Sequence, residues 1–185
     1  MRLLHAFQGV ERVAYAADSS RRENDAEHTF FLAMLSWYLS DSLGLRHSTD
    51  KLLRYALVHD LVEAYAGDSY IFDCEARETK KEREAEAQER IKKEFPEFVA
   101  LHEAIEAYEQ QGDPEAIFVH AVDKLIPLVI NYVQDGKTWK DFKVSHADLV
   151  TYKRAAIGEH HKEVRDLLEQ FLALIDQDRG RYFNA

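Results

Sequence analysis

The stretch that decides the fold is LLRYALVHDLVEAYAGD at residues 52–68. Its apolar residues recur at spacings of three and four, which is the period of an amphipathic α-helix. Ser48 or Thr49 is a suitable N-cap for this helix, and Gly67 is a suitable terminator. The pattern therefore predicts one helix that begins near Ser48 and ends at Gly67.

Helical patterns also cover most of the chain outside this stretch. Asn24 and Glu27 have the spacing of a capping box, and Asp113 followed by Pro114 is an N-cap with a proline in the first turn. The expected helices span residues 2–17, 24–43, 75–94, 96–110, 113–134, 145–158 and 160–178. Because no linker, internal repeat or low-complexity tract interrupts them, we expect an all-α helical bundle that forms a single domain over residues 1–185.

Composition limits the classes of partner. The chain has 185 residues, with 24 Lys and Arg against 34 Asp and Glu, so its formal net charge is −10. Binding to the nucleic-acid backbone over a broad surface needs a basic face, so we expect no nucleic-acid partner. No apolar run reaches the ~20 residues that span a bilayer, so we expect no membrane partner. A lone cysteine, Cys74, allows no intramolecular disulfide, and a cytoplasmic location is the expectation.

Four side chains suited to metal binding lie among apolar residues of the predicted helices. His28 shares a helical face with leucines, His59 and Asp60 lie in the middle of the 48–67 helix, and Asp123 lies on the face of Val119. Each has an ordinary explanation by itself, as a hydrogen-bonded core histidine or a carboxylate paired with Arg or Lys. Together, two imidazoles and two carboxylates would neutralise one another around one divalent cation, and N and O donors suit Mn, Co, Fe, Zn or Mg.

Glu63 adds a possible catalytic carboxylate. It follows His59 by four residues and Asp60 by three, so a continuous helix would place it on their side. There it could orient or deprotonate a water molecule, or it could be an exposed carboxylate with no such role. Pro127 cannot donate a hydrogen bond to the carbonyl of Asp123, so we expect a bend in the helix beside that residue.

These motifs resemble those of a known family. Glu27-His28, the LVHDLVEAYAGD of residues 57–68 and the AVDKL of residues 121–125 are similar to the HD-domain phosphohydrolases, especially the branch with the bacterial 5′-deoxynucleotidases. The resemblance covers roughly residues 1–135, and the order H…HDxxE…GD…D is far more specific than a single His-Asp pair. Residues 136–185 carry no motif of the family and are expected to form C-terminal helices.

The resemblance implies a helical bundle of the HD-domain type and a role for each matching residue. Asp60 and Glu63 would be catalytic, with Glu63 beside the nucleophilic water, and Arg12 would hold the phosphate. The metal ligands implied are His28, His59, Asp60 and Asp123. The residues implied to line the nucleotide pocket are Asp68, Ser69, Tyr70 and Ile71.

The implied activity is a metal-dependent phosphomonoesterase that converts nucleoside 5′-monophosphates, with 2′-deoxyribonucleotides as the expected class, to nucleoside and phosphate. It would use one divalent ion, Mn, Co, Mg, Fe or Zn, and the enzyme would bind only its small-molecule nucleotide, with a homodimer possible by resemblance. One position departs from the branch, because the tryptophan that follows the phosphate-binding arginine there, and favours deoxyribose over ribose, is Val13 in this chain.

Two alternatives remain open from the sequence. The same centre could hydrolyse another phosphate ester, either a phosphodiester or a nucleotide with a pyrophosphate group. The chain could also be a non-catalytic helical scaffold whose His and Asp cluster is structural. The reaction product distinguishes the first alternative, and the absence of any phosphate-ester hydrolysis distinguishes the second.

Overall fold

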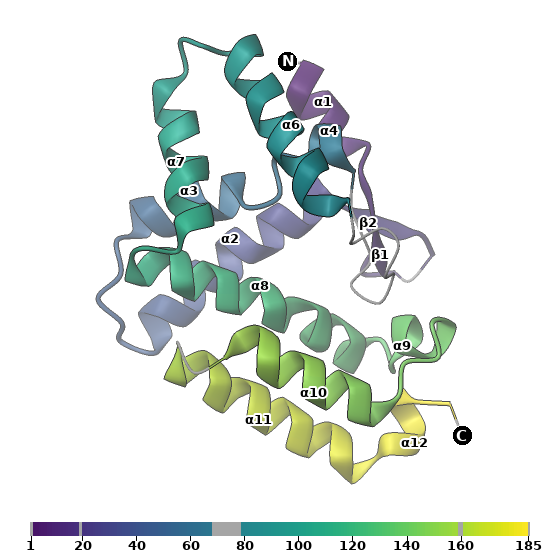
Figure 1. The fold of residues 1–185 in the computed structure, drawn as a ribbon. Helices are drawn as coiled ribbons and strands as arrows, with labels where there is room; N and C mark the ends of the chain where they lie inside the picture. The colour runs from purple at the N-terminus through teal and green to yellow at the C-terminus, as the bar shows by residue number, and fades with distance from the viewer. Residues whose placement is uncertain (1, 19, 68–78, 159–160, 185) are drawn as a thin grey trace.

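The computed structural model describes residues 2–18, 20–67, 79–158 and 161–184, and it is a helical bundle with one small β-hairpin (Figure 1). The elements are α1 Arg2–Gln8, β1 Glu11–Tyr15, β2 Arg22–Asn24, α2 Asp25–Ser42, α3 Thr49–Val58, α4 Glu63–Ala66, α6 Lys80–Glu94, α7 Val99–Gln110, α8 Pro114–Val133, α9 Lys137–Asp141, α10 His146–Ile157, α11 Lys162–Gln177 and α12 Arg179–Tyr182.

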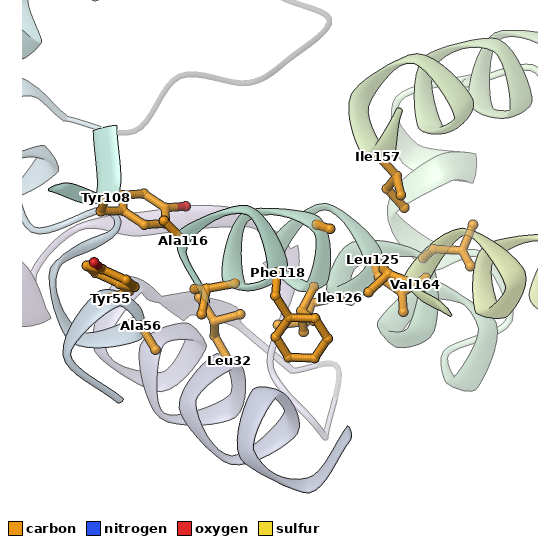
Figure 2. Packing of buried hydrophobic residues seen from close by; sticks show 14 of the residues in the cluster. Leu32, Tyr55, Ala56, Tyr108, Ala116, Phe118, Leu125, Ile126, Ile157 and Val164 are labelled. Carbon is orange, nitrogen blue, oxygen red and sulfur yellow. The ribbon is translucent and has the colours of Figure 1, made fainter. Parts of the chain in front are cut away.

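Helix α8 is the centre of the bundle. It packs against α2 and α3 on one side and against α10 and α11 on the other (Figure 1). Figure 2 shows Leu32 of α2 beside Phe118 of α8, and Ile157 and Val164 of the C-terminal helices near Leu125. By length and composition α8 is apolar enough to cross a membrane, but more than half of it is buried inside the protein. Its hydrophobicity is therefore that of a core helix.

The hairpin corrects the expected helix over residues 2–17. Helix α1 ends at Gln8, and Glu11–Tyr15 instead pairs antiparallel with Arg22–Asn24. The guanidinium of Arg22 lies 3.9 Å from the centre of the Tyr15 ring, which adds a cross-strand contact that a helix would not allow. The predicted helical bundle is thus confirmed, with one small hairpin added to it, and Arg12 lies on a strand.

The predicted helix from Ser48 to Gly67 is also interrupted. Helix α3 ends at Val58, and the next residues form tight turns in which the N–H of Glu63 donates to the carbonyl of Asp60, at 2.8 Å. Helix α4 then runs to Ala66, and Gly67 ends it with φ of 76°, as predicted. His59 and Asp60 therefore lie in a turn between two helices, not in the middle of one.

The remaining helices agree with the local signals in the sequence. Asn24 and Glu27 form both hydrogen bonds of the capping box at the start of α2. Asp113 accepts a hydrogen bond from the N–H of Ala116 at the start of α8. The helices expected near residues 75–94, 96–110, 145–158 and 160–178 are α6, α7, α10 and α11, with starts up to a few residues later. Residues 75–78 lie outside the described part of the chain, and the short helices α9 and α12 were not predicted.

Candidate active site

The four side chains predicted as metal ligands lie together. His28 comes from α2, His59 and Asp60 from the turn after α3, and Asp123 from the middle of α8. One ligand atom from each lies within 4.8 Å of the others. The Nε2 atom of His28 is 2.9 Å from Oδ1 of Asp123, and Nε2 of His59 is 2.9 Å from Oδ2 of Asp60. The fold thus brings residues 28, 59, 60 and 123 to one point between three helices.

Neighbouring basic side chains favour the ionised form of both carboxylates, although both are largely buried. The side chain of Asp123 is 6% exposed and that of Asp60 is 20% exposed. Burial by itself would raise both pKa values, but the neighbouring basic side chains outweigh it. His59 and Arg12 hold the pKa of Asp60 below its ordinary value, and Lys124 and His28 do the same for Asp123. Both carboxylates are therefore available as anionic ligands.

The orientation of His59 fits a metal ligand. Its Nδ1 atom lies 2.8 Å from the carbonyl of Ala56, so this nitrogen carries the proton and donates it to the backbone. The Nε2 atom then presents its lone pair to Asp60 and Asp123, and within the described residues it makes no hydrogen bond although it is buried. A backbone carbonyl that fixes one ring nitrogen while the other faces carboxylates is typical of a metal-binding histidine. The donor set therefore fits a divalent cation.

Arg12 lies at the edge of this cluster. Strand β1 positions it so that Nη1 is 2.8 Å from Oδ2 of Asp60 and 2.9 Å from Oδ1 of Asp25, and Nε is 3.4 Å from Oε1 of Glu23. This puts a guanidinium group directly beside one of the four candidate ligands. Sequence reasoning missed Asp25 and Glu23, because acidic residues near the start of a helix are common without any functional role.

Glu63 also lies at the site, but for a different reason than the sequence suggested. It is the first residue of α4, and the tight turn after α3, rather than a continuous helix, brings it back toward Asp60. Carboxylate oxygens of Asp25, Asp60 and Glu63 lie within 4.8 Å of one another. Nζ of Lys80 is 3.4 Å from Oε1 of Glu63. Burial would lower the pKa of Lys80, but Glu63 and Glu84 raise it, so the ammonium stays charged beside the candidate base.

The residues expected to line the nucleotide pocket, Asp68, Ser69, Tyr70 and Ile71, lie outside the described residues. Their role in the nucleotide pocket therefore stays a prediction.

Two lysines behind Asp123 were missed by sequence reasoning. Nζ of Lys124 is 2.7 Å from Oδ2 of Asp123, and Nζ of the buried Lys153 on α10 donates to the carbonyl of Lys124 at 2.5 Å. Burial and the charge of Lys124 lower the pKa of Lys153 to about 7. A signal was present, because Leu149, Lys153 and Ile157 recur every four residues and so place a lysine on the apolar face of its helix.

Comparison with known proteins extends the likeness over nearly the whole chain. Residues 5–165 match the HD domain family. The 5′-deoxynucleotidase HDDC2 of Homo sapiens is 27% identical over 177 residues, which are 94% of this chain and 83% of the human protein. The 5′-deoxynucleotidase YBR242W of Saccharomyces cerevisiae is 32% identical over 129 residues, which are 65% of this chain and 52% of the yeast protein. The crystal structure of a predicted metal-dependent phosphohydrolase from Magnetospirillum magnetotacticum MS-1 superposes with a TM-score of 0.82 at 30% identity, and the match covers 98% of this chain and 93% of that one.

Proposed function

Because this chain belongs to the HD domain family of metal-dependent phosphohydrolases, we propose that it releases phosphate from nucleoside 5′-monophosphates, with 2′-deoxyribonucleotides as the preferred class. The observation that carries the proposal is the convergence of His28, His59, Asp60 and Asp123 beside the guanidinium of Arg12. The likeness to 5′-deoxynucleotidases supports the choice of substrate.

The four converging side chains would hold one divalent cation, with Mn, Co, Mg, Fe and Zn all compatible with two imidazoles and two carboxylates. Such an ion supplies Lewis acidity that polarises a phosphoryl oxygen and makes water a better nucleophile. The chain itself fixes the ligand geometry, since the carbonyl of Ala56 orients the ring of His59 and Lys124 holds one oxygen of Asp123.

Arg12 would bind the phosphate group of the substrate. A guanidinium has five N–H donors, so Arg12 can contact phosphate oxygens while it keeps an ion pair with Asp25. Its charge would offset the negative charge on the phosphoryl oxygens, and this stabilisation is largest where that charge is greatest, in the transition state. Oδ2 of Asp60 lies 2.8 Å from Nη1 of Arg12, and this contact keeps the guanidinium next to the site of reaction.

Glu63 would act as the general base. As the water oxygen bonds to phosphorus and the bond from phosphorus to the 5′ oxygen breaks, Glu63 accepts a proton from the water, and the departing 5′ oxygen takes up a proton from solvent water to leave as the nucleoside hydroxyl. The ammonium of Lys80, 3.4 Å from Glu63, favours the ionised carboxylate that this role needs.

The partner of this enzyme would be a small nucleotide rather than a nucleic acid or a membrane. A net charge of −10 disfavours a long polyanion, whereas one phosphate held by a cation and an arginine is compatible with it. With a lone cysteine in the chain, a cytoplasmic location fits the same proposal.

A phosphate-release screen tests the proposal. The chelator-treated protein is assayed on ribo- and deoxynucleoside 5′-monophosphates with Mn, Co or Mg, and on a phosphodiester and a nucleoside triphosphate as controls. We expect phosphate from the monophosphates only after metal is added, and faster release from dAMP than from AMP. Full activity without metal would contradict the mechanism, equal rates on dAMP and AMP would contradict the sugar preference, and turnover of only the controls would favour another phosphate ester.

A further inference from the structure

Strand β1 is irregular at Arg12. The cross-strand pairs Glu11 with Asn24 and Tyr15 with Arg22 enclose three residues on β1 but only one on β2, so β1 bulges between them. Arg12 is the first residue of this bulge. A β-bulge bends its strand and changes the direction in which its side chains point, and bulges are common beside active sites. The direction of the Arg12 side chain therefore depends on how the bulge is held.

Arg22 holds the bulge from the partner strand. Its Nη1 donates a hydrogen bond to the carbonyl of Val13, the residue next to Arg12. Its guanidinium also lies over the ring of Tyr15, the last residue of β1, at 3.9 Å from the ring centre. Residues inside a bulge are left out of the regular ladder of backbone hydrogen bonds, so their carbonyls need other donors. Arg22 supplies one such donor and restrains the backbone beside Arg12.

The same end of the hairpin is attached to the segment around α9 (Figure 1). Nη2 of Arg22 is 3.7 Å from Oδ2 of Asp141, and the hydroxyl of Tyr15 donates to this oxygen at 2.6 Å. Nζ of Lys137 lies 4.0 Å from the centre of the Tyr15 ring, and the amide of Gln134 donates to the carbonyl of Tyr15 at 3.3 Å. The end of α8 and helix α9 therefore hold the strand that carries the phosphate-binding candidate.

The head group of Arg12 is held separately from its backbone. Nη1 of Arg12 lies 2.9 Å from Oδ1 of Asp25 and 2.8 Å from Oδ2 of Asp60. A guanidinium that binds phosphate through two parallel hydrogen bonds must lie at a defined place and angle, so both ends of its side chain need support. Asp25 and Asp60 support the head group, and Arg22 supports the backbone.

We propose that Arg22 is a positioning residue for Arg12, and that Asp141 on α9 supports Arg22 in this task. The inference rests on the proposed function, in which Arg12 binds the phosphate of the substrate. It gives α9, which lies outside the motifs of the family, a part in phosphate binding. The contact of Arg22 with Asp141 contributes little to stability, since the two atoms are 3.7 Å apart and the Asp141 side chain is 41% exposed. Its main effect is on the place of Arg12.

Binding of inorganic phosphate to the Mn-loaded protein, measured by calorimetry, tests the proposal. In Arg22→Ala we expect phosphate to bind about 10-fold to 100-fold more weakly, since a displacement of about 1 Å at a positioned group can cost about 100-fold. Mn affinity should stay within a few-fold of the wild type, because none of the four candidate ligands lies on the hairpin. Circular dichroism checks that the variant is folded.

Arg154→Ala is the matched control for Arg22→Ala. Arg154 also joins two elements through an ion pair, since its Nη2 is 2.7 Å from Oε2 of Glu169 on α11, and its side chain is 56% exposed. Phosphate affinity should stay at the wild-type value in this variant. Wild-type phosphate affinity in Arg22→Ala, or an equal loss in Arg154→Ala, would overturn the proposal.

A double-mutant cycle shows whether Arg22 acts through Arg12. Arg12→Lys keeps a cation beside the buried Asp25 but loses the planar guanidinium, so phosphate affinity should fall. In that background Arg22→Ala should cost less than about twofold, because the group that Arg22 positions is absent. Losses that multiply in the double variant would overturn the positioning role. Failure of the proposed function is distinct, because Arg12→Lys alone would then keep wild-type phosphate affinity, and the inference would be wrong with it.

Asp141→Ala tests the link to α9. It removes the acceptor shared by Tyr15 and Arg22 but leaves the hydrogen bond of Arg22 to Val13, so we expect a smaller loss of phosphate affinity, about threefold to tenfold. This loss should also disappear in the Arg12→Lys background. Wild-type phosphate affinity in Asp141→Ala, or the same loss in both backgrounds, would overturn the role of α9.

Discussion

Asp113 and Asp123 are two carboxylates of one helix, the first at the N-cap of α8 and the second in its middle, and their partners differ in kind. Asp113 accepts hydrogen bonds from the hydroxyl of Tyr55 at 2.6 Å, from Nζ of Lys51 at 2.9 Å and from the N–H of Ala116 at 2.9 Å. Asp123 contacts Lys124 at 2.7 Å and two imidazoles, those of His28 at 2.9 Å and His59 at 4.0 Å.

The difference gives a criterion that separates a structural carboxylate from a candidate metal ligand. Burial alone is a weak guide, since buried carboxylates are also common in structural ion pairs. The partners of Asp113 are a hydroxyl, an ammonium and a backbone N–H, and each of them donates a hydrogen bond to the carboxylate. The partners of Asp123 include two ring nitrogens, which are themselves metal ligands. A site is therefore identified by acids that face other potential ligands rather than hydrogen-bond donors.

Removing Asp123 should have the largest effect. Asp123→Ala takes away one anionic ligand and leaves His28 and His59 without their shared carboxylate. Loss of a residue that only supports a ligand already costs 10–100-fold, so we expect kcat/KM and Mn affinity each to fall by more than about 100-fold. Calorimetry with Mn and a phosphate-release assay measure the two quantities. Activity within a few-fold of the wild type would place the reaction elsewhere.

Glu63→Gln should separate catalysis from metal binding. The amide keeps the size of the side chain but cannot accept a proton from water, so turnover should fall by roughly 10²–10⁴-fold. Since Glu63 is not one of the four converging ligands, Mn affinity measured by calorimetry should stay within a few-fold of the wild type. A parallel loss of both quantities would instead make Glu63 a ligand.

Lys153→Met should have a smaller effect that reaches the site through α8. Pro127 has no N–H to donate to the carbonyl of Asp123, and Lys153 instead binds the next carbonyl, that of Lys124. Without Lys153 this turn of α8 is less constrained, so we expect Mn affinity to fall about tenfold, as for other residues that support a ligand.

Calorimetry with Mn measures the effect of Lys153→Met, and urea titration at pH 7 measures stability. The free energy of unfolding should change little, because methionine removes a hydrogen bond but also removes a buried charge. Lys162→Met on α11 is the matched control, since its side chain is 73% exposed and pairs with Asp166 four residues on, and it should leave Mn affinity unchanged. Wild-type Mn affinity in Lys153→Met would show that Lys153 does not position the ligand.

Local signals predicted most of the helices, because caps and apolar periodicity act over a few residues. The capping box at Asn24 and the Asp113-Pro114 start are examples. The hairpin was missed because residues 11–15 form a strand only through pairing with residues 22–24. The break after Val58 was missed because the apolar period continues through it, although the tight turns and the bond of the His59 ring to a backbone carbonyl replace the regular helix.

The sequence identified the four candidate ligands that the structure brings together, but few of the residues that contact them. His28, His59, Asp60 and Asp123 were identifiable because polar side chains in apolar helical faces need partners. Asp25 and Lys80 were not, because their contacts join residues that are far apart in the sequence. The apolar face of α10 marks Lys153 as a buried lysine, but not its contact with the carbonyl of Lys124.

Asp113→Asn should have the smallest effect on catalysis and a clear effect on stability. Burial would raise the pKa of Asp113, but hydrogen bonds from Tyr55 and Lys51 lower it to about 2, below the ordinary 3.8. The unfolded chain therefore takes up a proton before the folded one does, so this contribution is present above about pH 4 and is lost as pH falls toward 2.

Asparagine keeps the N-cap of α8 but loses the charge, so the free energy of unfolding at pH 7 should fall by about 1–2 kcal/mol. The difference from the wild type, measured by urea titration, should shrink between pH 4 and pH 2, while phosphate release stays at the wild-type rate. If Asp113→Asn instead lowered activity and left stability intact, the kind of partner would not distinguish the two carboxylates. If stability falls while phosphate release is unchanged, the two acids of α8 have different roles. Asp113 accepts hydrogen bonds that hold α3 to α8, whereas Asp123 faces imidazoles.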